Sequence, residues 1–306
     1  MQKEFVPVML TPFKENGLID FDGLTMLTEY YLESGSKGLF ANCLSSEMFD
    51  LTASERLQVV QHVMKATNGS VPVVATGTFD RDLKSQAEFI KRIADTGVQA
   101  VIVISSIIAD ENEKDTIFNQ RIYDLLKLTE NISLGFYECP VPYKRLISPE
   151  QLKLFIETER VTYHKDTSLD IGQVRAKISA GAGHHFGLYD AYMVNAVESL
   201  KAGAAGLSCI QGNYFPELVV WLCDNFNKPE LADDVQKVQD FFSNNMDVMH
   251  DVYPFSAKYC LQKQGLSIST KVRTPGKSFS TLTKTLVDEL DNNCQMLKKE
   301  LNILQR

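Results

Sequence analysis

The sequence contains no long hydrophobic run, no dense stretch of basic residues and no cysteine pair of the CxxC type. A bilayer-spanning helix needs about 20 mostly apolar residues, so we expect no membrane span, and no apolar signal segment opens the chain. A net charge of −8 without a basic stripe argues against nucleic-acid binding. The six cysteines are scattered, several of them in apolar patterns, which predicts buried free thiols and a cytoplasmic protein.

Signals for several familiar kinds of site are missing as well. The first apolar run is followed by Thr11, Pro12 and Phe13, not by the glycine-rich turn of a dinucleotide-binding fold. No G-x-S-x-G turn presents a nucleophilic serine. His184 and His185 are adjacent in a predicted strand and should point to opposite faces. We therefore expect no metal site.

Short apolar runs alternate with amphipathic stretches as far as about residue 226, and successive runs end roughly 20 to 33 residues apart. That spacing suits one strand plus one crossover helix. The predicted strands are 5–10, 38–43, 72–76, 99–105, 132–137, 160–165, 185–190 and 206–210. The predicted helices between them include 21–34, 53–66, 82–96, 115–128 and 193–202. Glycines at the ends of four of these units, Gly35, Gly69, Gly97 and Gly203, fit helix C-terminal caps.

Eight strand–helix units in about 225 residues fit a closed barrel better than an open sheet. Beyond residue 228 the pattern is only helical, over 231–248, 254–264 and 281–304. We predict an α/β protein with a (β/α)8 TIM barrel at residues 1–228. The C-terminal helical extension, residues 229–306, should pack on the barrel within a single structural unit.

The predicted sixth strand ends in a lone lysine, Lys165, followed by the turn and cap residues Asp166, Thr167 and Ser168. Active sites of such barrels lie at the carboxyl ends of the strands. A lysine that points into an enclosed interior loses hydration and its pKa falls, so the neutral amine can attack a carbonyl and form a Schiff base. His164 should then point outward as a structural histidine. The plainer alternative is a solvated lysine at a loop edge.

Tyr137 ends the preceding predicted strand, and adjacent strands are about 4.8 Å apart. The two side chains could act together as a lysine nucleophile and a tyrosine proton shuttle. Alternatively, the tyrosine caps the barrel core. After the second strand, Ser45 and Ser46 could hold a carboxylate, although paired serines are also common in ordinary loops. Glu47 should fix this loop rather than contact an anion.

The chain resembles the dihydrodipicolinate synthase / N-acetylneuraminate lyase family of class I aldolases from Phe5 to about Thr281. Residues 163–168 resemble its lysine strand, G-[IV]-K-[DE]-[ST]-[ST], and residues 137–140 its Y-N-x-P motif. Residues 43–47 fall on the G-[ST]-T-G-E loop that holds the carboxylate of a 2-oxo acid. Residues 206–216 are similar to the eighth-strand segment, and residues 258–266 to the C-terminal K-x-x-L-x-x-x-G-L.

The resemblance implies a barrel that forms a Schiff base between Lys165 and a 2-oxo acid, usually pyruvate, with Tyr137 transferring protons. Ser45 and Ser46 would bind the carboxylate, and Ser208 of the eighth-strand segment would be a further substrate-binding residue. Such an enzyme needs no metal and no added cofactor, because the imine nitrogen is the electron sink. The family also implies a homo-oligomer, either a dimer or a tetramer.

The chain departs from the family on the side of the second substrate. Pro142 stands where the synthase has the arginine that binds this substrate's carboxylate, with Lys144 and Arg145 as candidate substitutes. Tyr192 and Met193 stand where the sialic acid lyase has acidic residues for sugar hydroxyls. The acceptor pocket should therefore be altered and more apolar, without either of these two specificities.

Further departures concern the carboxylate loop and the fourth strand. Leu44 replaces a hydroxyl residue of the loop. Ile107 and Ile108 replace the tyrosines that end the fourth strand in many members, one of which joins a proton relay across the subunit interface. With Ile107 and Ile108 in place of the interface tyrosine, the expected oligomer is less secure.

We predict a Schiff-base-forming lyase, an aldolase or hydro-lyase acting on pyruvate or another 2-oxo acid. One alternative is a catalytically decayed, aldolase-like barrel that serves as a binding or regulatory protein. The other is a barrel enzyme of a different class in which Lys165 acts only electrostatically.

Overall fold

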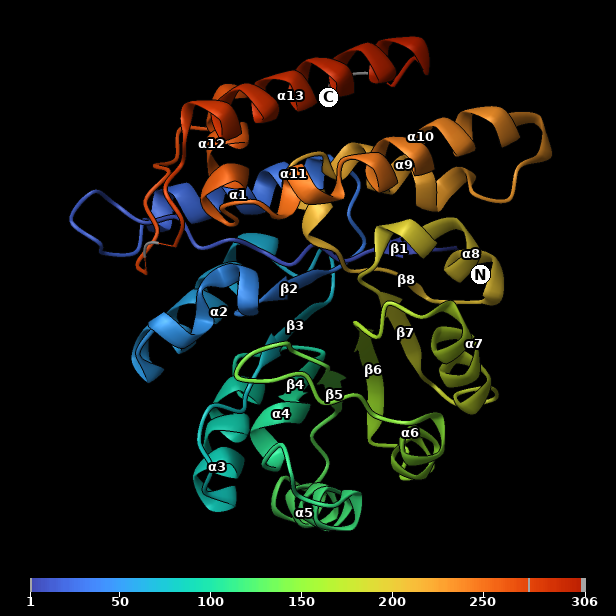
Figure 1. Cartoon of the computed structure of the whole chain (residues 1–306). Coiled ribbons are helices and arrows are strands. Elements are labelled where there is room, and N and C mark those ends of the chain that lie inside the picture. The colour runs from blue at the N-terminus through green and yellow to red at the C-terminus, as the bar shows by residue number, and fades with distance from the viewer. Residues whose placement is uncertain (1, 275, 304–306) are drawn as a thin grey trace.

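Eight short parallel strands form one sheet in the order β1-β8-β7-β6-β5-β4-β3-β2, in a computed structural model that describes residues 2–274 and 276–303. The sheet closes because the chain beyond β1 reaches β2, where the Phe40 N–H donates to the Pro7 carbonyl at 2.9 Å and the Met9 N–H to the Phe40 carbonyl at 3.0 Å. The predicted (β/α)8 TIM barrel is thus confirmed (Figure 1). The strands are β1 Glu4–Phe5, β2 Leu39–Ala41, β3 Val73–Thr76, β4 Ala100–Ile104, β5 Leu134–Tyr137, β6 Val161–Asp166, β7 Gly187–Asp190 and β8 Gly206–Leu207.

Helices on the outside of the barrel connect successive strands. They are α1 Phe21–Glu33, α2 Ala53–Thr67, α3 Leu83–Ala94, α4 Ser105–Ile108, α5 Asp115–Leu128, α6 Pro149–Ile156, α7 Ile171–Ala180 and α8 Ala196–Ala202. Local sequence explains several of their starts: Thr52 and Glu55 form a capping box at α2, as do Ser148 and Gln151 at α6. The four predicted cap glycines all have positive φ, between 73° and 113°, which confirms them.

The strands are buried on both faces, so the sheet has one apolar core outside and another inside. The outer core lies between strands and helices, and the inner core includes Phe40, Ile102 and Tyr163. The seam between β1 and β8 is so close that a Cβ added to Gly206 would lie 1.9 Å from the Glu4 carbonyl oxygen. Only glycine permits this approach.

In the described part of the chain, five α-helices follow the eighth strand: α9 Pro216–Asn225, α10 Ala232–Asn244, α11 Met246–His250, α12 Phe255–Lys263 and α13 Thr281–Glu300. Figure 1 shows them as orange and red layers on the side of the barrel that carries α1. The helix predicted over 231–248 is divided at Asn245 into α10 and α11. The predicted end of the last helix, Leu304, lies outside the described residues. Among the described helices, none is both long and apolar enough to cross a membrane.

Candidate active site

Lys165 lies near the carboxyl end of β6 with its side chain inside the barrel. Side chains alternate along a strand, so Tyr163 shares the inward face of Lys165, while His164 and Asp166 face the helices. Only 3% of Lys165 is exposed. The structure therefore removes the alternative of a solvated lysine at a loop edge.

The surroundings of Lys165 disfavour its charged form. Burial lowers the pKa of its ammonium group, against opposing effects of the thiols of Cys43, Cys139 and Cys209. In the part of the chain that the structure describes, no carboxylate forms an ion pair with Lys165. Its Nζ lies 4.4 Å from the centre of the Tyr137 ring and 5.8 Å from that of Phe40. The side chain is thus a buried amine without a counter-ion.

Tyr137 is the direct register partner of Lys165. The two residues pair across the parallel β5–β6 ladder, as expected from their positions at the ends of neighbouring strands. Tyr137 is 4% exposed, and burial raises the pKa of its phenol well above the usual value. At neutral pH the phenol keeps its proton and can act as a proton donor.

The loop after β2 places Ser45 and Ser46 differently. It makes a 3-10 turn, Leu44–Ser46, between Asn42 and Glu47, which both have a φ of 56°. The Ser46 hydroxyl donates to the Met9 carbonyl at 2.6 Å and accepts from the Cys43 N–H at 3.0 Å. Ser45 instead lines the cavity that contains Lys165. Ser45 is therefore the serine of this loop that a substrate can reach directly.

Glu47 holds the same loop to the C-terminal helices. Its carboxylate accepts hydrogen bonds from Nζ of the buried Lys258 at 2.6 Å and from the Arg273 N–H at 2.7 Å. The Lys258 ammonium also donates to the Lys271 carbonyl at 2.7 Å. Lys258, the lysine of the C-terminal motif, thus balances the charge of Glu47. Through these bonds Glu47 fixes the loop, as expected.

Ser208 lies deeper in the barrel than the other predicted site residues. Its fully buried hydroxyl donates to the Val6 carbonyl at 2.9 Å and accepts from the Tyr163 hydroxyl at 3.4 Å. Ser208 is not among the residues that line the cavity around Lys165.

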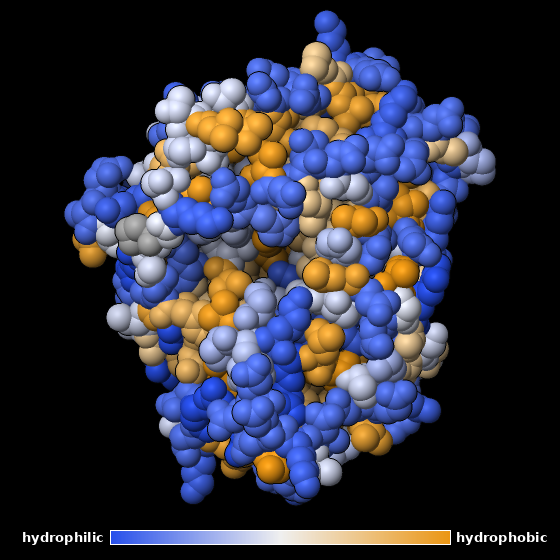
Figure 2. Space-filling view, in the orientation of Figure 1, coloured by the Kyte–Doolittle hydropathy of each residue, from blue (hydrophilic) through white to orange (hydrophobic). Residues whose placement is uncertain are grey.

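A cavity of about 730 Å³ opens at the carboxyl ends of the strands and contains Lys165, Tyr137 and Ser45. Loops after β2, β5, β6, β7 and β8 form its walls together with the segment around α11. Apolar side chains on these walls include Leu44, Phe49, Val141, Leu169, Ile210 and Met246. Figure 2 shows the face of the molecule seen in Figure 1 hollowed near its centre, with apolar residues on the walls.

Lys144 and Arg145 do not reach this cavity. The Lys144 Nζ donates to the Thr167 carbonyl at 2.8 Å, and the buried Arg145 guanidinium pairs with Asp115 at 2.8 Å. Among the described residues, no arginine and no lysine other than Lys165 lines the cavity. Neither candidate therefore replaces the missing arginine.

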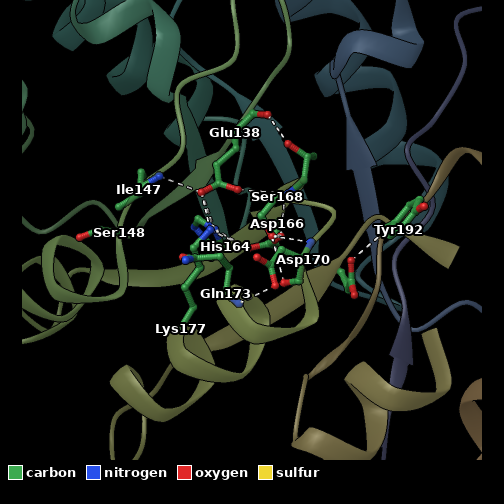
Figure 3. A network of polar contacts seen from close by, with 12 residues as sticks. Glu138, Ile147, Ser148, His164, Asp166, Ser168, Asp170, Gln173, Lys177 and Tyr192 are labelled. Carbon is green, nitrogen blue, oxygen red and sulfur yellow. Dashed lines mark hydrogen bonds and ion pairs between the residues drawn. The ribbon is translucent and has the colours of Figure 1, made fainter. Parts of the chain in front are cut away.

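A buried network of charges lies directly behind Lys165, between β5, β6 and α7 (Figure 3). Lys177 reaches in from α7, and its Nζ lies 2.6 Å from Glu138 Oε1 and 2.7 Å from Asp166 Oδ2. The His164 Nε2 is 3.6 Å and 3.8 Å from the same two oxygens, and all four side chains are fully buried. Burial opposes charge on each group. Their mutual attraction nevertheless lowers the pKa of both carboxyls and raises the pKa of His164 and Lys177.

Glu138 also ties together the chain segments on either side of the reactive pair. Its carboxylate accepts from the Ile147 N–H at 2.8 Å and from the Thr167 N–H at 3.2 Å. Because Glu138 follows Tyr137 in the chain, and Thr167 lies two residues beyond Lys165, these bonds hold the ends of β5 and β6 in place. The network therefore positions the two inward-facing side chains.

Glu138, His164 and Asp166 place potential metal ligands within 4.8 Å of one another. The Lys177 ammonium already lies between the two carboxylates, so a protein cation occupies the position that a metal ion would take. His184 and His185 are exposed in the turn before β7, not in the strand itself as predicted. Within the described chain, His164, His184 and His185 therefore form no open metal site.

Two residues of this region were not predicted from the sequence. Lys177 lies on the buried face of α7 with Val174, three residues earlier, and a lysine on an apolar helix face was the available signal. Tyr253 lines the cavity from the segment between α11 and α12. No local pattern connects that segment with the barrel mouth.

Comparisons with known proteins agree with this fold. The model of the dihydrodipicolinate synthetase family matches residues 1–292. A 4-hydroxy-tetrahydrodipicolinate synthase from Ruegeria pomeroyi is 26% identical over 292 residues, which cover 94% of this chain and 97% of that protein. One from Methanococcus maripaludis is 22% identical and covers 97% of both chains.

Solved structures with the same fold have still lower sequence identity. The sialic acid aldolase of Ruminococcus gnavus, solved as a catalytic lysine mutant, has a TM-score of 0.86 at 19% identity, covering 98% of this chain and 97% of that one. The prophage protein YagE of E. coli K12, solved with pyruvate, has a TM-score of 0.84 at 19% identity, covering 97% and 98%. At these identities the structures establish the shared fold.

Proposed function

We propose that this chain, which belongs to the dihydrodipicolinate synthetase family and is a lyase of the class I aldolase type, forms a Schiff base between Lys165 and pyruvate or another 2-oxo acid. The observation that carries this proposal is the buried Lys165 amine, which has no carboxylate partner among the described residues and pairs in register with Tyr137. Both side chains open onto one cavity. Pyruvate-bound relatives such as YagE support the choice of substrate class.

The reaction would begin when the neutral Lys165 amine attacks the keto carbon of the 2-oxo acid. The resulting carbinolamine loses its hydroxyl as water when Tyr137 supplies a proton, and a protonated imine remains. The substrate carboxylate would accept a hydrogen bond from the Ser45 hydroxyl. The imine nitrogen then takes up the electron pair released when the carbon–carbon bond is cleaved. In a hydro-lyase it would take up the pair left when the carbon next to the imine loses a proton, and that pair would then expel the hydroxyl group, which leaves as water.

The second substrate should be an aldehyde without a carboxylate of its own. Recognition of a carboxylate usually uses an arginine or lysine, and Lys165 is the sole such residue on the described cavity wall. The wall is mainly apolar, and Tyr192 supplies a polar group near the end of β7. In a kinetic screen with pyruvate, an aliphatic aldehyde should be turned over faster than one of equal length that ends in a carboxylate. The opposite order would contradict this assignment.

The Schiff base can be tested directly by intact-protein mass spectrometry after borohydride reduction with pyruvate. We expect the wild type to gain the mass of one reduced pyruvate and Lys165→Ala to gain none. Lys144→Ala is the matched control, because Lys144 lies close by but bonds a backbone carbonyl, and this variant should still form the adduct. A wild type that forms no adduct with pyruvate or longer 2-oxo acids would overturn the proposal. An adduct without turnover would favour the decayed barrel.

We also propose that the chain forms a homo-oligomer, either a dimer or a tetramer, in the cytoplasm. Ile107 and Ile108 of α4 are buried within the protomer, at 6% and 3% exposure, so an interface must use residues other than these two. All six cysteines are buried free thiols, which suits a reducing compartment. Sedimentation equilibrium tests the assembly, and a monomer at micromolar concentration would exclude it.

A further inference from the structure

Tyr253 lies where two cavities of the protein meet. Its side chain lines the cavity that holds Lys165, Tyr137 and Ser45. It also lines a second cavity of about 770 Å³, bordered by polar side chains that include Glu15, Lys271, Lys277 and Ser278. Tyr253 itself is partly exposed, whereas Tyr137 is 4% exposed. A phenol in this position can connect the reacting centre with water outside it.

The backbone next to Tyr253 is strained. Val252 has a φ of 55°, in the left-handed region that β-branched residues rarely adopt. Such strain persists only where surrounding contacts enforce it, and it is concentrated at functional sites. Here it affects the residue directly before the phenol that enters the cavity.

Hydrogen bonds hold the Tyr253 oxygen in a defined orientation. The Asn213 amide donates to the Tyr253 oxygen at 2.5 Å and to the Val8 carbonyl at 2.8 Å, and it accepts from the Tyr31 hydroxyl at 2.5 Å. The Tyr253 oxygen therefore accepts a bond from the barrel side, which leaves its own O–H available for donation. An oxygen that already accepts an amide hydrogen bond is also better prepared to carry a transient negative charge.

Tyr253 shares the wall of the Lys165 cavity with Ser45 and Tyr137. Burial raises the pKa of its phenol, while the Ser45 hydroxyl lies close enough to oppose this effect. The pKa of Tyr137 is raised chiefly by burial and, in a smaller part, by Tyr253. The two phenols therefore lie within electrostatic reach of each other.

We propose that Tyr253 relays protons to Tyr137 during formation and release of the imine. This inference rests on the proposed function of Lys165. When Tyr137 gives its proton to the departing carbinolamine hydroxyl, water leaves and a Tyr137 phenolate remains. The Tyr253 O–H then protonates this phenolate, and water in the second cavity restores the proton to Tyr253. Imine hydrolysis runs the same transfers in reverse, so no proton is gained or lost over the cycle.

The test compares the rate of imine formation in the wild type, Tyr253→Phe and Tyr30→Phe by borohydride trapping at a series of times. Tyr30 is the matched control, because its phenol is also held by an amide side chain, donating to Gln264 at 3.0 Å, but lies away from both cavities. Tyr253→Phe should slow trapping roughly tenfold to a hundredfold with an unchanged final amount of adduct. Tyr30→Phe should trap at the wild-type rate.

A second measurement separates proton transfer from a structural role. Increasing imidazole buffer supplies a small general acid, which should raise the rate of Tyr253→Phe towards that of the wild type. A misfolded or mispacked variant would not respond to the buffer. Provided that the wild type forms the adduct, two results would overturn the relay. One is a trapping rate in Tyr253→Phe equal to that of the wild type, and the other is a slow rate in this variant that imidazole does not raise. A wild type that forms no adduct would instead overturn the function of Lys165.

Discussion

Replacing Asp190 by asparagine should make the protein more stable at neutral pH and change the dependence of its stability on pH. Asp190 ends β7 as the register partner of Asp166 and is 1% exposed. Its Oδ1 accepts from the Tyr192 N–H at 2.8 Å, and thereby orders a loop of the cavity wall. Among the described groups, its Oδ2 and the Ser199 hydroxyl are buried without a hydrogen-bond partner. A proton on Asp190 would give this carboxyl a donor.

The magnitude follows from the pKa of this carboxyl. Burial, and to a lesser degree the charge of Asp166, raises the pKa of Asp190 from its ordinary value of 3.8 to about 7. The folded state therefore holds the proton more tightly than the unfolded state. The stabilisation is fully present below pH 4 and is lost as the pH rises through 7. The whole difference corresponds to roughly 4 kcal/mol, of which about 2.5 kcal/mol is lost between pH 5 and 8.

Urea unfolding at pH 5 and at pH 8, followed by the fluorescence of Trp221, measures this effect. Asp190→Asn does not titrate, and its amide can donate to Ser199 as the protonated acid does. The free energy of unfolding of this variant, relative to wild type, should therefore rise by about 2.5 kcal/mol from pH 5 to pH 8. Ser199→Ala is the control, since it keeps the titrating carboxyl and loses a hydroxyl that lowers the pKa of Asp190, so its stability should still fall between pH 5 and pH 8. If the free energies of unfolding of wild type and Asp190→Asn differ by the same amount at pH 5 and at pH 8, the reasoning is refuted.

Three further substitutions test the reactive pair and the charges around it. Lys177→Met leaves two buried carboxylates without their ammonium partner and should lower the free energy of unfolding, measured in urea melts, by about 3–5 kcal/mol. The exposed control Lys127→Met should lower it by less than about 0.5 kcal/mol. A loss below about 1 kcal/mol for Lys177→Met would contradict the stabilising role of the network. Lys258→Met should cost a similar amount by leaving Glu47 unpaired and should weaken pyruvate capture in borohydride trapping, whereas unchanged capture would show that the loop holds itself in place. Tyr137→Phe should slow turnover by about 10²-fold or more in steady-state assays with little change in the urea midpoint; unfolding of this variant would assign the tyrosine to packing.

The barrel and its reactive pair were accessible from sequence because their signals are local. Strands buried on both faces read as continuous apolar runs, and each predicted strand overlaps an observed one. The pairing of Lys165 with Tyr137 followed from their positions at the ends of consecutive strands, since parallel strands joined by one crossover lie side by side. The alternation of side chains also predicted that His164 faces outward.

Which side chains line the cavity depends on contacts between distant parts of the chain. Ser45 and Ser46 are adjacent and chemically alike, yet Ser46 bonds the Met9 carbonyl, 37 residues away in sequence, and Ser45 faces the cavity. Tyr253 reaches the same cavity only because the chain between α11 and α12 turns over the mouth of the barrel.

The sequence alone therefore determined the class of fold, the ends of β3 to β7 to within one residue and the residues that could form a Schiff base, because periodicity and chain order control these features. The first and last strands are shorter than predicted, since β1 ends at Phe5 and β8 at Leu207. Tertiary structure decided which side chains meet at the reactive centre. Lys177 from α7 lies between Asp166 of β6 and Glu138, which directly follows β5, and Tyr253 lies beside Ser45, because packing of elements far apart in the chain brings them together. The direction of each buried pKa shift depends on the same contacts, since burial and charge partners exist only once the chain has folded.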